Sequence, residues 1–168
     1  ATRDDDVDKF YWLIAKQYNL VLNDMFFAEK MHINVKEILG YVLVARSIER
    51  IADHAKKIAT NAREITINHE CLGKIETTSE KILKSFDSAI NAFHRGKFDP
   101  ANEVINDSKQ LSDEIDDLKK SMFSIDADAK NVASLAYVID SLERTRAYVI
   151  DIAEVSVNHQ FATMLDLK

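Results

Sequence analysis

The chain has few of the residues that form turns, strands and cross-links. Three glycines and one proline in 168 residues lie far below average usage. Tight turns and strand boundaries depend on these residues, so their scarcity excludes a fold of many short strands and favours long helices joined by few loops. The one cysteine, Cys71, excludes an internal disulfide bond, which fits a reducing cytoplasm.

An excess of basic charge and long apolar runs are also lacking. The formal net charge of −6 disfavours nonspecific nucleic-acid binding and a polybasic membrane patch. No apolar run approaches the length of a membrane span, and the opening ATRDDDVDK does not resemble a signal peptide. We therefore expect a cytoplasmic chain without membrane insertion or direct nucleic-acid binding. No glycine-rich phosphate loop, Ser/His/Asp set or Cys/His set is evident, so we do not expect an enzyme.

What the sequence does have is helical periodicity. Apolar residues recur at intervals of three and four in five segments, at about 5–29, 34–68, 74–95, 99–122 and 128–159. Asn34 is a candidate N-cap for the second segment, Gly96 a stop for the third, and Asp99 with the following proline a start for the fourth. Short connections between such helices predict an all-α antiparallel bundle of about five long helices.

The sequence also contains two similar halves. DDDVDKF near the start is similar to SDEIDDL, and ARSIERIADHAKKIA is similar to DSLERTRAYVIDIAE. We predict a single domain over 1–168, with repeat one at about 1–69 and repeat two at about 74–160. Only six residues precede Val7, whereas about forty residues of repeat two precede Ile115, so repeat one lacks a leading helix. Either the chain is a fragment of a longer protein or another surface, most simply a homodimer partner, covers the open groove.

Glu49 and Asp53 form the most informative pair of side chains. They are four residues apart, on one face of the second predicted helix, and their like charges repel unless a cation or partner lies between them. Acids at this spacing more often decorate a solvated face, and Arg46 and Arg50 are close enough to neutralise them. His54 points about 100° away from Asp53 around the helix, which predicts a capping or surface histidine.

Taken together, these strings resemble the PhoU domain of phosphate-uptake regulators. The resemblance rests on SIERIADHAKKIA and SLERTRAYVIDIAEVSVN, with DDDVDKF and SDEIDDL beside them. DDDVDKFYWLIAKQ and DIAEVSVN look most like the archaeal branch, where many members carry a small DNA-binding domain ahead of the PhoU part. The resemblance implies two three-helix repeats and a cytoplasmic, non-enzymatic regulator. Its implied partners are phosphate transporter components or a sensor kinase, reached through protein–protein contacts.

The resemblance also implies metal binding, because some PhoU proteins hold iron or zinc clusters on paired Glu/Asp-x-x-x-Asp motifs. Oxygen-only ligands on rigid helices suit iron, manganese, magnesium or calcium, and suit zinc less well. The resemblance favours iron, with zinc, manganese and magnesium as other candidates. The primary ligands that it implies are Asp4, Asp8, Glu49 and Asp53.

A second metal site is expected to be degenerate. Its remaining acids are Asp116 and Glu143, whereas Ser112 and Ala147 occupy the positions that match Asp4 and Asp53. Arg146, next to the vacated position, could supply the positive charge that a metal would otherwise bring. The alternative to a metal-binding regulator is a helical dimerisation or effector module without a metal role, attached to a DNA-binding domain or to an ion channel or transporter.

Overall fold

The computed structural model describes residues 2–33 and 35–166. Within these ranges it contains six α-helices and no strand, which confirms the predicted all-α antiparallel bundle. The helices are α1 (Thr2–Asn23), α2 (Met25–Met31), α3 (Val35–Ala62), α4 (Cys71–Arg95), α5 (Phe98–Met122) and α6 (Ala129–Asp166). Five of them are long, as the periodicity predicted, and α2 is a short addition.

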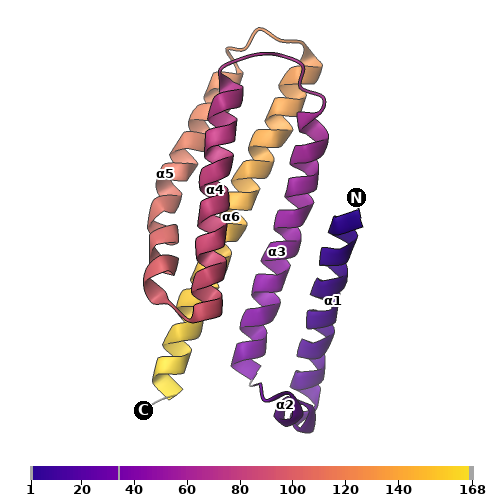
Figure 1. The fold of residues 1–168 in the computed structure, drawn as a ribbon, viewed down its shortest axis with the longest axis vertical. Helices are drawn as coiled ribbons and strands as arrows, with labels where there is room; N and C mark the ends of the chain where they lie inside the picture. The colour runs from indigo at the N-terminus through magenta and orange to yellow at the C-terminus, as the bar shows by residue number, and fades with distance from the viewer. Residues whose placement is uncertain (1, 34, 167–168) are drawn as a thin grey trace.

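The two longest helices, α3 and α6, pack against each other and carry the other long helices on either side. α1 packs on α3, while α4 and α5 pack on α6 and on each other (Figure 1). Repeat two therefore corresponds to a three-helix unit, α4–α5–α6. In repeat one only α1 and α3 form a long pair. The division into two repeats is consistent with this layout and stays a prediction.

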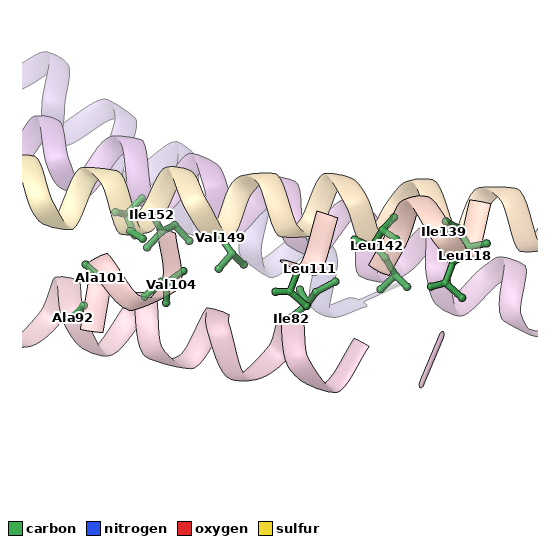
Figure 2. Close-up of a cluster of buried hydrophobic side chains, with 14 of the residues drawn as sticks. Ile82, Ala92, Ala101, Val104, Leu111, Leu118, Ile139, Leu142, Val149 and Ile152 are labelled. Carbon is green, nitrogen blue, oxygen red and sulfur yellow. The ribbon is translucent and has the colours of Figure 1, made fainter. Parts of the chain in front are cut away.

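The hydrophobic core lies mainly between α4, α5 and α6. Side chains from these three helices project into the space between them (Figure 2). Burial of one large aliphatic side chain stabilises the fold by about 1.5–3 kcal/mol, so this unit carries most of the stability. The largest fully buried side chains are Ile115, Leu135, Val149, Ile152 and Ser156.

The α1 side of the bundle has a thinner core. Val21 is the one buried side chain among the described residues of α1. Phe10, Leu13 and Leu20 are each half or more exposed, and Trp12 is 61% exposed. This exposure agrees with a repeat that lacks a third helix.

The first predicted helix, 5–29, is interrupted at Asp24. Asp24 has an extended backbone (φ −140°, ψ 101°), and its carboxylate accepts hydrogen bonds from the backbone N–H groups of Phe26 and Phe27. It therefore acts as the N-cap of α2 and ends α1 one residue earlier. α2 ends at Met31, and the next residue, His32, is its C-cap and adopts the left-handed conformation. The predicted cap at Asn34 lies outside the described residues.

The other predicted helix boundaries are partly right. α3 ends at Ala62, six residues earlier than predicted, and the following connection is tied to α6 by Asn131. Gly96, at φ 59°, ends α4 as predicted, because glycine adopts this left-handed conformation without steric cost. α5 begins at Phe98 with Lys97 as its N-cap, so Asp99 lies in the first turn and is not the cap.

Candidate acidic site between α1 and α3

Asp4 and Lys56 connect the two helices that carry the predicted ligands. The Lys56 ammonium donates a hydrogen bond to Oδ2 of Asp4, from α3 to α1. The Asp4 side chain is only 10% exposed, and its Oδ1 atom is buried without a hydrogen-bond partner. A buried carboxylate oxygen with free lone pairs is an unusual feature, because buried polar atoms are nearly always paired.

Glu49 lies in an environment that disfavours its charge. Burial raises the pKa of Glu49, and the neighbouring carboxylates of Asp53 and Asp8 raise it further, while the positive charge of Arg50 opposes the rise. Three of the four predicted ligands, from α1 and α3, thus influence one another electrostatically. A cation placed among them would relieve this repulsion.

The protein supplies its own cations to three of the four acids. Lys56 pairs with Asp4, Nε of Arg50 lies 3.4 Å from Oε2 of Glu49, and Nη1 of Arg50 lies 3.9 Å from Oδ2 of Asp53. Asp8 makes no hydrogen bond or ion pair with the side chains that the structure describes. Among the described side chains, no three from His, Cys, Asp and Glu are grouped closely enough to hold a metal ion. A metal bound by all four carboxylates must therefore displace Lys56 and Arg50.

In the second half of the chain an arginine takes the central position. Nη2 of Arg146 lies 2.6 Å from Oε1 of Glu143, and Nη1 of Arg146 donates to the backbone carbonyl of Ser108 on α5 at 3.4 Å. Asp116 is half exposed and pairs with Lys119 on its own helix at 3.3 Å. The predicted second pair of acids is thus divided between two separate ion pairs, one with Arg146 and one with Lys119. That these acids are the remnant of a metal site stays a prediction.

Comparison of the chain with known protein families gives a match over the two helices that carry this site. Residues 1–62 match the PhoU domain. The matched stretch contains α1, α2 and α3, and with them all four carboxylates of the candidate site. It covers less than half of the 168 residues, and no curated protein matches the chain.

The PhoU match bears on several expectations from the sequence, and it supports some of them and not others. PhoU family proteins are non-enzymatic regulators, so the match supports the expectation that the chain is not an enzyme. The family is known to bind metal clusters, although the match itself does not show metal binding here. It does not support the archaeal assignment. No described helix is both long enough and apolar enough to span a bilayer.

The PhoU-matched helices also enclose a cleft that the sequence did not reveal. Its volume is about 370 Å³, and it lies between α1 and α3. The Asp4–Lys56 pair lies at the cleft, together with Arg3 and Arg63, which form no ion pair with any residue that the structure describes. The lining also includes three small α3 side chains, namely Ala52, Ala55 and Ala59. The doublet Lys56-Lys57, one turn beyond Asp53, was the sequence signal for cations beside the acids.

His54 is not the surface or capping residue that the sequence predicted. It is only 8% exposed, and its ring centroid lies 6.0 Å from that of Tyr148 on α6. Burial lowers the pKa of His54, and the charge of Lys57 lowers it further. The prediction failed because α3 is covered on two sides. The face that carries the acids meets α1, and the face 100° away meets α6.

Proposed function

We propose that this protein is a PhoU-like, cytoplasmic regulator of phosphate uptake that acts through protein–protein contacts with phosphate transporter components or a sensor kinase. The observation that carries the proposal is the coincidence of two features on one stretch of chain. The PhoU match covers residues 1–62, and the same residues form the helix pair whose acids cluster around Glu49. A non-catalytic role fits a surface of ion pairs on two packed helices.

The test is phosphate uptake in the organism that encodes the chain. Deletion of the gene is expected to raise phosphate uptake in phosphate-rich medium, and the wild-type chain is expected to restore regulation. A Glu49→Gln/Asp53→Asn variant is expected to restore it poorly. Its matched control is Glu76→Gln/Glu80→Gln, which removes two exposed acids at the same spacing on α4. Unchanged uptake after deletion would overturn the proposal.

We also propose that Asp4, Asp8, Glu49 and Asp53 bind a metal ion, with iron favoured and zinc, manganese and magnesium as other candidates. Two observations support a fit. Oδ1 of Asp4 is buried and unpartnered, and the pKa of Glu49 is raised by burial and by neighbouring acids. The opposing observation is that Lys56 and Arg50 already pair with three of these acids. The ion would bind in competition with the two side chains.

Metal binding can be tested separately from regulation. Elemental analysis of the purified protein gives the bound metal, and thermal unfolding with Fe²⁺, Mn²⁺, Zn²⁺ or Mg²⁺ gives the linked stabilisation. A ligand at one hundred times its Kd stabilises the fold by about 2.7 kcal/mol. Glu49→Gln/Asp53→Asn should lose this gain, whereas Glu76→Gln/Glu80→Gln should keep it. No co-purified metal and no stabilisation by any ion would reject the metal site and leave the regulatory proposal standing.

The ion pairs that already neutralise these acids favour one alternative, a helical dimerisation or effector module without a metal role, attached to a DNA-binding domain or to an ion channel or transporter. In that case Lys56 and Arg50 are permanent partners of the carboxylates. The complete reading frame of the gene distinguishes this alternative at once, because it reveals or excludes such a domain.

A further inference from the structure

The cleft between α1 and α3 is lined by more positive than negative charge. The start of α1 lies beside the second half of α3 (Figure 1), where Lys56 reaches Asp4. Arg3 of α1 and Arg63 of α3 line the same cleft. Three positive side chains and one negative one therefore give the lining a net charge of +2. In a chain with a formal net charge of −6, this local excess of positive charge attracts anions to one place.

The two arginines of the cleft are available to an anion. Arg3 and Arg63 are exposed, and neither forms an ion pair or hydrogen bond with any residue that the structure describes. Each guanidinium offers five N–H donors in a planar fork that fits two oxygen atoms of a phosphate group. Lys56 adds further donors, because its ammonium has three N–H groups and Asp4 accepts from one of them. Both helices thus direct charged donors to the cleft.

The α3 side of the cleft leaves room for a ligand between its cations. Lys56 and Arg63 are seven residues apart, about two turns along one face of the helix. The lining near them consists of small side chains, namely Ala55, Ala59 and Thr60, and the Thr60 hydroxyl is turned back to donate to the Lys56 carbonyl at 2.9 Å. The volume of about 370 Å³ lies at the lower end of the range for small-molecule sites.

A second groove on α3 differs from this cleft in its charge. It lies between α3 and α6 and has a volume of about 600 Å³. Arg46 and Arg50 line its α3 wall, whereas Asp151 and Glu154 line its α6 wall. Because these charges balance, the second groove has no net attraction for an anion. The excess of positive charge is thus a property of the α1–α3 cleft and not of every hollow along α3.

Acidic residues next to the cleft limit how strongly an anion can bind. Asp5 and Asp6 follow Asp4 on α1 and are exposed, but neither belongs to the lining. Asp6 lies 3.2 Å from the ammonium of Lys9. Salt at about 0.1 M screens these solvent-exposed acids more than it screens the contacts between a bound ligand and the cations that touch it. We therefore expect weak binding that depends on direct contact with the arginines.

We propose that the α1–α3 cleft binds the phosphate group of a small ligand, either inorganic phosphate or a phosphate ester. Arg3 holds the group from α1, and Lys56 and Arg63 hold it from α3. A phosphate group has a charge of about −1.5 to −2 at neutral pH and directs its oxygen atoms in several directions. It therefore matches a lining of charge +2 on two helices better than a planar carboxylate with a single charge. This site rests neither on the regulatory role nor on metal binding.

The test is a titration of the chelator-treated chain in phosphate-free buffer, followed by amide NMR spectra. One titration adds inorganic phosphate and another adds glycerol phosphate, with sodium chloride keeping the ionic strength constant. Amide signals of residues 3–7 and 52–63, which contain the lining, are expected to shift until they saturate. Saturation by inorganic phosphate alone identifies the free ion as the ligand, whereas tighter saturation by the ester identifies the phosphate end of a larger molecule. Chelation ensures that the anion binds through the protein's own side chains.

Two double variants decide whether the cleft is the site. Arg3→Gln/Arg63→Gln should weaken phosphate binding by at least about tenfold, because it removes two of the three cations. The matched control, Lys57→Gln/Arg95→Gln, removes the same total charge from exposed positions outside the lining and should change binding by less than about twofold. Circular dichroism establishes that both variants are folded. No saturable shift with either ligand, shifts confined to other residues, or an equal loss of binding in the two variants would each overturn the proposal.

Discussion

Lys56 on α3 donates a hydrogen bond to Asp4 on α1, across 52 residues of sequence. Because the Asp4 carboxylate is 10% exposed, loss of the ammonium would leave a largely buried charge without its counterion. Lys56→Met is therefore expected to lower the midpoint of thermal unfolding at pH 7 in metal-free protein. Lys57→Met, at the neighbouring exposed position, should change it much less. Equal effects of the two substitutions would contradict a stabilising role for the pair.

Glu49→Gln is expected to stabilise the chelator-treated protein at neutral pH. The folded state raises the pKa of Glu49, so the ionised carboxylate opposes folding at a pH above its folded value. This cost is absent below the unfolded pKa of about 4.3, where the group is protonated in both states. The gain from Glu49→Gln should thus be present at pH 7 and vanish below about pH 4. Urea unfolding at several pH values measures it, with the exposed Glu76→Gln as the control.

Arg146→Met is expected to destabilise the fold by about 2 kcal/mol, less than the 3–5 kcal/mol typical of a fully buried pair. Arg146 and Glu143 are 14% and 24% exposed, so removal of the guanidinium leaves Glu143 poorly solvated. Lys119→Met breaks the exposed pair with Asp116 and should cost less than about 0.5 kcal/mol. Adding Glu143→Gln to Arg146→Met should recover much of the loss. Urea unfolding of the three variants decides the point.

Asn131→Ala is expected to destabilise the fold by about 2 kcal/mol and to loosen the connection between α3 and α4. The Asn131 side chain is buried, its Oδ1 accepts from the Thr66 backbone N–H at 2.8 Å, and its Nδ2 donates to Asp128 at 3.0 Å. Hydrogen exchange should speed up at residues 63–70 in particular. The control is Asn91→Ala, because the exposed Asn91 amide donates to the Asp87 carbonyl of its own helix. Unchanged amide exchange at residues 63–70 would contradict the stabilisation of this connection by the Asn131 hydrogen bonds.

The sequence predicted the five long helices because their apolar periodicity is a local property of each segment. It could not predict the break at Asp24, because the apolar pattern continues through it and the cap forms only when the side chain turns back onto Phe26. Nor could it predict the burial of His54, because the apolar pattern of one helix does not show that both α1 and α6 cover α3. The contact between Lys56 and Asp4 depends on the register between helices, which a single sequence does not specify.

The position of Arg50 has a thermodynamic consequence. Its guanidinium lies near Glu49 and Asp53 and also lines the groove that faces Asp151. A metal ion that replaces it at the carboxylates would release it toward the acidic α6 wall of that groove. The two positions of Arg50 are then linked, and reciprocity requires that any ligand which holds Arg50 at the α6 wall tighten metal binding by the same factor by which the metal tightens that ligand. One arginine would thus couple occupancy of the acidic site to the charge that the groove presents.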